Sequence, residues 1–253
     1  MAGMTDDLFR QDAYLRECSA HITAVTDAGI VLDRTVFYPL GGGQAGDSGV
    51  LMLADGTELA IVDTRKGKDA EGNPTSDIVH VPAPGQEALL TTLTPGTAVT
   101  ARIDWERRHR MMRLHTTSHL LCHVVPQLVN GCSITPDYAR LDFAMTDPLD
   151  KEQLTAAIAT LVAAAHPLTV ASISDEELDA NPALVKSMSV QPPRGTGRIR
   201  TIRIGGEGDA PLIDLQPCGG THVANTAEIG AIVVTKIEKK SATTRRVVLG
   251  FVP

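Results

Sequence analysis

The stretch His115-Thr-Thr-Ser-His119 places two histidines four residues apart, and Cys218-Gly-Gly-Thr-His222 repeats that spacing much later in the chain. Residues four apart project from one face of a helix, so both imidazoles can reach a single ion. The distant cysteine and histidine can complete a tetrahedral nitrogen and sulfur site, which suits zinc better than magnesium or calcium. Because ligands from two distant segments must then meet, the pairs also constrain the fold. We predict one zinc ion per chain, held by His115, His119, Cys218 and His222.

A chance pair of histidines on an amphipathic helix is the alternative interpretation, and His123 continues the same helical row. The second pair makes the metal interpretation the stronger one, because two glycines separate a candidate thiolate from a candidate imidazole. Glycine tolerates backbone angles that other residues avoid, so Cys218 and His222 could turn toward one point. The isolated histidines are better explained as surface or packing residues; these are His21, His80, His109 and His166.

Length and composition are those of a globular protein with one large domain or two ordinary domains in 253 residues. No apolar run approaches the roughly 20 residues of a membrane span. The N-terminal segment lacks the basic region and apolar core of a signal peptide. The four cysteines form no dense disulfide framework, which favours a cytoplasmic protein with reduced thiols. A net charge of -7 argues against indiscriminate nucleic-acid binding.

Basic residues nevertheless gather in three clusters. Their side chains can contact phosphates through charge and bidentate hydrogen bonds. For any single cluster a solvated face is the simpler explanation, but three clusters in an acidic chain indicate a localised RNA footprint. They comprise Arg102, Arg107, Arg108, Arg110 and Arg113; then Arg194, Arg198, Arg200 and Arg203; then Lys236, Lys239, Lys240, Arg245 and Arg246.

The first part of the chain, residues 1–103, is rich in strand signals. Asp55-Gly56 lies between two apolar segments and is a strong hairpin signal. The polar stretch 65–85, interrupted by Gly and Pro, is typical of an exposed loop. We therefore expect a small β-barrel. Its strands are predicted near 21–26, 30–36, 49–54, 57–63, 87–93 and 97–103.

Residues 104–253 predict an α+β domain, with helices packed on a mainly antiparallel sheet. The long helix 105–128 carries the first histidine pair, and the Ala-rich segment 150–165 has an apolar stripe. Ser174 and Glu177 form a capping box for a short helix. Strands are predicted at 137–145, 198–204, 212–215, 229–238 and 245–252.

Several motifs, in the same order along the chain, resemble those of the alanyl-tRNA editing proteins, which are free-standing relatives of the editing domain of alanyl-tRNA synthetase. They span from about residue 34 to the C-terminus, and both halves of the chain contribute. The motifs are Phe37-Tyr-Pro-Leu-Gly-Gly-Gly-Gln44 with Asp47-Ser-Gly49, His115-Thr-Thr-Ser-His119-Leu-Leu, Arg140-Leu-Asp-Phe143, Cys218-Gly-Gly-Thr-His222-Val and Thr226-Ala-Glu-Ile-Gly230.

The resemblance implies a barrel domain over 1–103, which contains the glycine-rich motif, and a zinc-binding editing domain over 104–253. It implies hydrolysis in trans of tRNA(Ala) mischarged with serine or glycine, with zinc as cofactor. It also places the glycine motif near the editing cleft. Three glycines permit close approach of a ligand to the backbone, although a tight turn is an alternative. The candidate substrate-binding residues are Gly41, Gly42, Gly43 and Thr221.

The residues are compatible with more than one mechanism. Asp142 and Gln44 are candidate catalytic residues that could orient water, the substrate amine or the ribose, although Asp142 could instead pair with Arg140. Zinc could activate water or only position the substrate. Threonyl-type editing, a noncatalytic zinc-stabilised tRNA-binding module and a zinc hydrolase of small esters are the alternatives. No feature of the sequence decides the oligomeric state.

Overall fold

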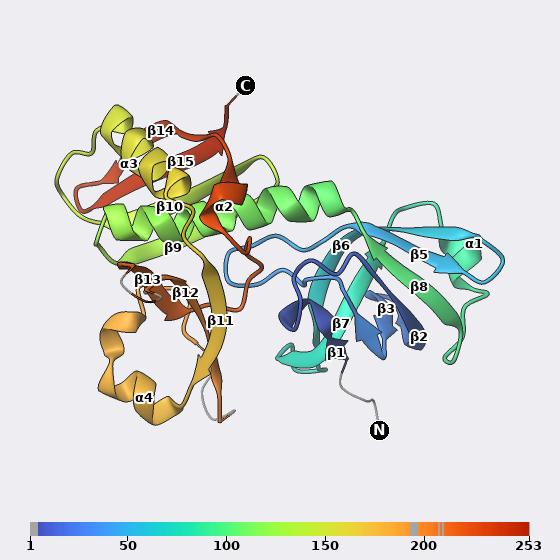
Figure 1. The fold of residues 1–253 in the computed structure, drawn as a ribbon. Coiled ribbons are helices and arrows are strands. Elements are labelled where there is room, and N and C mark those ends of the chain that lie inside the picture. The colour runs from blue at the N-terminus through green and yellow to red at the C-terminus, as the bar shows by residue number, and fades with distance from the viewer. Residues whose placement is uncertain (1–4, 193–196, 207, 209, 253) are drawn as a thin grey trace. The chain divides into compact units, whose positions relative to one another are not determined.

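The computed structural model describes residues 5–192, 197–206, 208 and 210–252 (Figure 1). The chain forms two compact units, of which the first comprises Met1–Gly41 with Ala45–His109. The second comprises Gly42–Gln44 with Arg110–Pro253. The sequence places a boundary at 103/104, whereas the units change inside helix α2 (Trp105–Val124). The architecture is α+β with mostly antiparallel sheets, as predicted.

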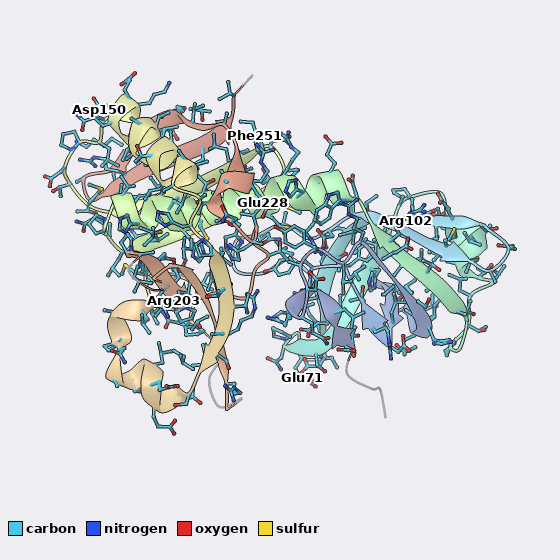
Figure 2. All side chains as sticks on the ribbon, viewed as in Figure 1. Glu71, Arg102, Asp150, Arg203, Glu228 and Phe251 are labelled. Carbon is cyan, nitrogen blue, oxygen red and sulfur yellow. The ribbon has the colours of Figure 1, made fainter. Side chains whose placement is uncertain are left out.

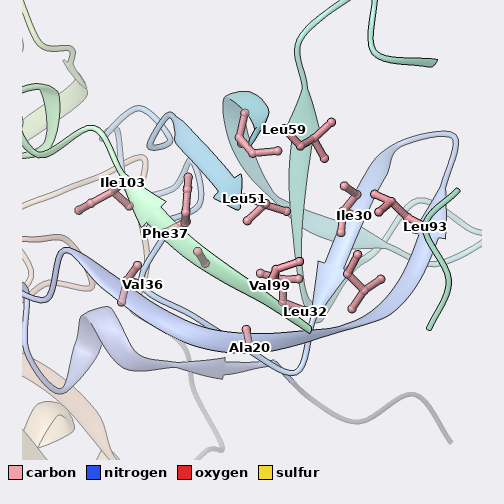
Figure 3. Close-up of a cluster of buried hydrophobic side chains, with 13 residues drawn as sticks. Ala20, Ile30, Leu32, Val36, Phe37, Leu51, Leu59, Leu93, Val99 and Ile103 are labelled. Atoms are coloured by element: carbon pink, nitrogen blue, oxygen red, sulfur yellow. The ribbon is translucent and has the colours of Figure 1, made fainter. Parts of the chain in front are cut away.

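In the first unit, six antiparallel strands close into a barrel in the order β2-β3-β7-β6-β5-β8. Side chains of a strand point alternately to its two faces, so Val99, Ala101 and Ile103 of β8 are buried while the residues between them are not. Such side chains fill the core in Figure 3. The barrel strands are β2 (Glu17–Thr26), β3 (Gly29–Leu32), β5 (Gly49–Leu53), β6 (Glu58–Lys68), β7 (Pro74–Pro82) and β8 (Ala98–Ile103).

Four short elements complete the described part of the first unit: β1 (Asp6–Asp7), η1 (Leu8–Arg10), β4 (Arg34–Thr35) and α1 (Glu87–Leu90). The prediction of a strand at 87–93 is wrong, because residues of high helix propensity form a single helical turn there. The side chain of Gln86, which precedes that turn, bonds both backbone groups of Ala60.

The predicted loop at 65–85 is also wrong, because β6 and β7 continue through it as a paired ribbon. The Asp69 side chain accepts hydrogen bonds from the backbone N–H groups of Glu71 and Asn73, which closes the turn between the two strands. The polar composition of this stretch therefore reflects largely exposed strand ends and not an irregular loop.

Arg108 is fully buried in the first unit, although the sequence groups it with candidate phosphate contacts. Its Nε donates to both carboxylate oxygens of Asp47, at 3.1 and 3.0 Å. Two further guanidinium nitrogens donate to the carbonyls of Val36 and Ala13. A buried charge requires such a set of partners. Arg108 is therefore a structural residue of this unit.

His80 is a second buried polar side chain of the first unit. Its Nδ1 lies 3.1 Å from the Ile30 carbonyl oxygen, and its Nε2 lies 2.8 Å from the Thr35 hydroxyl. Burial lowers the pKa of His80 from 6.5 to about 4, because a charged ring would lose its hydration. His80 is thus a neutral packing residue, as the sequence suggested.

The described part of the second unit contains two sheets. The four-stranded sheet has the order β14-β15-β10-β9, and the three-stranded sheet has the order β11-β12-β13. Helix α3 packs on β14 (Figure 1). Two arginines of α2 stack on Phe251 at the end of β15. The strands are β9 (Val129–Ile134), β10 (Tyr138–Ala144), β11 (Leu168–Ile173), β12 (Ile199–Gly205), β13 (Leu212–Pro217), β14 (Ile232–Ser241) and β15 (Thr244–Phe251).

The helices of this unit largely follow their sequence signals. Helix α3 (Lys151–Ala163) begins after Asp150, and α4 (Asp175–Ala180) has the predicted capping box of Ser174 and Glu177. Short helical turns η2 (Pro182–Leu184) and η3 (Thr226–Ile229) were not predicted, nor were the strands β9 and β11. Within the described residues, no helix is both long and apolar enough to span a membrane.

Candidate metal centre

Two segments bring the four predicted ligands together. Helix α2 supplies His115 and His119, and the segment after β13 supplies Cys218 and His222. One donor atom from each residue lies within 4.8 Å of the donor atoms of all the others. Cys218 Sγ is 3.4 Å from Nε2 of both His115 and His222. The three imidazoles are almost fully buried, so this compact group could hold a metal ion.

The remaining ring nitrogen of each histidine has an oxygen partner. Nδ1 of His115 lies 2.8 Å from Gln44 Oε1, Nδ1 of His119 lies 2.7 Å from Asp214 Oδ2, and Nδ1 of His222 lies 3.2 Å from Thr116 Oγ1. Metal-binding histidines are normally held in this way, because the outer hydrogen bond sets the tautomer and the ring orientation. The arrangement leaves three Nε2 atoms and one sulfur for an ion, which fits the predicted ligand set.

The pKa shifts of Cys218 and His222 also fit a metal site. Burial raises the pKa of Cys218, but the neighbouring His115 and His222 imidazoles bring that pKa well below its usual value. Burial, together with the charge of His115, lowers the pKa of His222 well below its usual value. A thiolate and neutral imidazoles are the forms that bind metals.

Asp214 contacts one of the four candidate ligands, and the sequence analysis missed it. It lies on β13, is almost fully buried and contacts Lys186 as well as His119. Burial raises the pKa of Asp214, but the hydrogen bond from His119 and the charge of Lys186 hold it at about 2. Burial lowers the pKa of His119, whereas its bond to Asp214 raises that pKa to about 9. The signal was present in the sequence as a lone carboxylate within the apolar strand 212–215.

Gly220 has a different role from the one expected of the two glycines in this motif. Its φ is not in the left-handed region, so backbone freedom is not the reason for glycine here. A Cβ at this position would lie 2.2 Å from Cε1 and 2.5 Å from Nδ1 of His115. The glycine therefore provides the space that the His115 imidazole occupies.

The glycine-rich motif ends at Gln44, and Gly42, Gly43 and Gln44 belong to the second unit. Gly43 has a φ of 84°, and a Cβ there would lie 2.3 Å from Cys132 Sγ. The Gly43 carbonyl accepts a hydrogen bond of 2.7 Å from Ile134 N, which holds the segment beside β9. Gly42 also has a positive φ, of 59°. In the first unit, the Gly41 carbonyl accepts a hydrogen bond from the Tyr38 hydroxyl.

Gln44 is fully buried, and its amide joins His115 to Thr221. Its Oε1 accepts from the Thr221 backbone N–H at 3.1 Å, and its Nε2 donates to the Thr221 hydroxyl at 2.8 Å. The same Oε1 also lies beside His115 Nδ1, so both the oxygen and the nitrogen of the Gln44 amide have partners. Such contacts orient the His115 ring and the backbone beside Gly220.

Asp142, the other candidate catalytic residue, lies on β10 between two arginines. Arg246 donates to it at 2.7 and 2.9 Å, and Arg140 donates at 2.8 Å. The pairing with Arg140 that the sequence offered as an alternative is therefore present. The hydrogen bond from Arg246 lowers the pKa of Asp142, so the group is an ionised acceptor at neutral pH.

The basic clusters divide into buried and accessible residues. Arg245 is largely buried and donates to backbone carbonyls, as Arg108 does in the first unit. The guanidinium carbons of Arg110 and Arg113 lie 4.1 and 4.5 Å from the centroid of Phe251, which Figure 2 labels. Arg194 lies outside the described residues.

Two protein families match parts of this chain. Residues 10–107 match the class II (A) tRNA synthetases. Residues 199–248 match the threonyl and alanyl tRNA synthetase second additional domain. The second match covers β12, β13 and the segment with Cys218 and His222.

Curated relatives match over most of the chain. The alanyl-tRNA editing protein AlaX-M of Saccharolobus solfataricus is 32% identical over 248 residues, which cover 96% of this chain and 98% of that protein. Its counterpart of the same name in Methanosarcina acetivorans is 33% identical over 254 residues, covering 96% and 97%. The alanine–tRNA ligase of Metallosphaera sedula is 35% identical over 244 residues, which span 25% of that longer protein. This chain belongs to the family of alanyl-tRNA editing proteins.

Proposed function

We propose that this protein is a trans-acting, zinc-dependent editing hydrolase of the cytoplasm that deacylates tRNA(Ala) mischarged with serine or glycine. The observation that carries the proposal is the match to proteins named for alanyl-tRNA editing over 95–98% of their length. The compact group of three imidazoles and one thiolate supports it. In this proposal 1–103 is the barrel domain and 104–253 is the editing domain.

A separate hydrolytic site answers a physical limit on amino-acid selection. A pocket that accepts alanine discriminates poorly against glycine, which is smaller, and against serine, which adds one hydroxyl. Hydrolysis of the ester at the tRNA 3′ end removes the wrong amino acid after it has been attached. The exposed Lys236, Lys239 and Lys240, in a chain with net charge -7, are suited to local contacts with the phosphates of this partner.

His115, His119, Cys218 and His222 are the proposed zinc ligands, since their donor set suits that ion. When bound, zinc would supply a Lewis acid next to the ester. Gln44 orients the His115 ring through its amide oxygen. Its other contact holds Thr221, the proposed substrate-binding residue, because the Thr221 hydroxyl accepts from Gln44 Nε2.

Asp142 is proposed to orient the substrate through its arginine partners, because two guanidinium groups next to a carboxylate keep a net positive charge. The glycine-rich segment Gly41–Gly43 is proposed to approach the substrate with its backbone, as glycines permit. Both assignments predict that a substitution at these positions lowers the rate of deacylation of mischarged tRNA more than it lowers the stability of the fold.

The test measures release of radiolabelled serine and glycine from mischarged tRNA(Ala), with alanyl-tRNA(Ala) as the correctly charged control. Zinc-loaded protein is compared with its Cys218→Ala variant and with Cys18→Ala, a matched cysteine change at a similarly half-buried position in the first unit. We expect release by the parent and by Cys18→Ala, little release by Cys218→Ala, and sparing of the alanyl ester.

Three results would contradict the proposal. Release from mischarged tRNA(Thr) instead would assign the threonyl-type activity that the shared family description includes. Binding of tRNA without any deacylation would indicate a noncatalytic module. Hydrolysis of small amino-acid esters at the same rate as aminoacyl-tRNA would indicate a general esterase.

A further inference from the structure

The three histidines of the candidate metal centre are not held alike. Gln44 offers a neutral amide oxygen to His115, and Thr116 offers a neutral hydroxyl to His222. Asp214 offers a carboxylate to His119, at 2.7 Å. A carboxylate partner raises the basicity of a ligating imidazole, whereas a neutral partner does so much less. His119 is therefore set apart from the other two rings.

The second carboxylate oxygen of Asp214 contacts the ammonium group of Lys186. The Asp214 side chain is fully buried, whereas that of Lys186 is 27% exposed. The Lys186 carbonyl accepts a hydrogen bond from Val129 N, and the Val129 carbonyl accepts one from Met188 N, both at 2.9 Å. These bonds attach the lysine segment to β9 and hold the ammonium group beside the carboxylate.

We propose that Asp214 is a positioning residue that holds His119 for metal binding, and that Lys186 limits the negative charge which Asp214 directs at that ring. The inference depends on the proposed function only in taking the His/Cys group as a metal site. Asp214 keeps the proton of His119 on Nδ1, which turns the Nε2 lone pair toward the other donors. Lys186 neutralises a carboxylate that would otherwise be buried with an excess charge.

This arrangement predicts opposite effects for changes in two residues that touch each other. Asp214→Asn keeps the shape of the side chain but removes its charge, so a divalent ion should bind about 10- to 100-fold more weakly. Lys186→Met removes a positive charge near the site, so the same ion should bind at least as tightly as in the parent, because its attraction to the centre increases. A purely structural ion pair would lose metal affinity in both variants.

The experiment uses the full chain, stripped of metal, and titrates it with Co²⁺ while recording the visible absorption bands. Zinc affinity is then measured by competition with a chromophoric chelator. Asp137→Asn is the matched control, because that carboxylate is 83% exposed in the same unit. We expect the Asp214→Asn cobalt spectrum to differ in band position and intensity, and the Asp137→Asn spectrum to equal that of the parent.

Metal binding by Asp214→Asn within twofold of the parent, with the same spectrum, would overturn the proposal. Weaker metal binding by Lys186→Met than by the parent would also overturn the proposal. This variant tests the proposal even if Asp214→Asn does not fold. A parent that binds no divalent ion would also refute it. A parent that binds cobalt with the expected variant pattern, yet releases no amino acid from tRNA, would leave this inference standing and contradict only the proposed function.

Discussion

Substitution of Gly220 by alanine is the most local perturbation of the candidate metal centre. The added Cβ would lie 2.2 Å from His115 Cε1, 2.5 Å from His115 Nδ1 and 2.9 Å from Gln44 Oε1. Ordinary contact between carbon atoms begins near 3.5 Å, so the ring must move by about 1 Å. Metal–ligand distances tolerate only about 0.2 Å, and His115 should therefore leave its position as a ligand.

The displaced ring cannot easily find another position. Its centroid is 4.2 Å from that of His222, and Gln44 holds its Nδ1 at 2.8 Å. We expect the Gly220→Ala variant to bind zinc about 10- to 100-fold more weakly, since misplaced outer partners of a ligand have effects of this size. That range corresponds to about 1.4–2.8 kcal/mol of binding free energy.

Chelator competition on the metal-stripped protein measures the loss directly, and circular dichroism checks that the variant folds. Gly131→Ala is the matched control, because the nearest neighbour of a Cβ there is Asp142 Oδ2 at 3.8 Å, an ordinary contact. Zinc affinity equal to that of the parent in a folded Gly220→Ala variant would refute the steric argument.

Three further predictions concern other buried side chains. The folded-state pKa of His80, about 4, lies below its unfolded value of 6.5, so stability is full above pH 6.5 and is lost as pH falls toward 4. His80→Gln should therefore reduce the stability loss between pH 7.5 and pH 5 by about 2 kcal/mol. Arg108→Met should destabilise the first unit by about 3–5 kcal/mol, because Asp47 is left as a buried, uncompensated charge. Gln44→Ala should weaken zinc binding by about tenfold or more, because His115 loses its outer partner.

Each of these predictions has a matched control. Urea unfolding followed by fluorescence of Trp105, the single tryptophan, reports on the first unit for the two stability predictions. The control His21→Gln changes a histidine whose side chain is 61% exposed. Arg102→Met breaks an exposed ion pair and should cost less than about 1 kcal/mol. Gln11→Ala, at an exposed site, should not alter zinc affinity. Equal effects in a test variant and its control would contradict the corresponding prediction.

The elements with strong local signals were predictable. A helix was predicted at 105–128 and forms at Trp105–Val124, and Asp55-Gly56 marked a real turn, in which Gly56 has a φ of 85°. The ribbon at 65–85 was not predictable from composition, because exposed strands and exposed loops are both polar. The short strand β11 was missed for a related reason, since none of its residues is fully buried and its apolar pattern is weak.

By itself, the sequence determined the family, the α+β class and the four candidate ligands, because these depend on residue identity and on spacing along one helix or one short segment. Only the tertiary structure decided which side chains hold those ligands. Gln44 is 71 residues from His115, and Asp214 is 95 residues from His119. The need for glycine at position 220 likewise became visible only from the place of the His115 ring. Contacts between distant residues depend on strand register and on packing between helices and sheets, and local spacing contains neither.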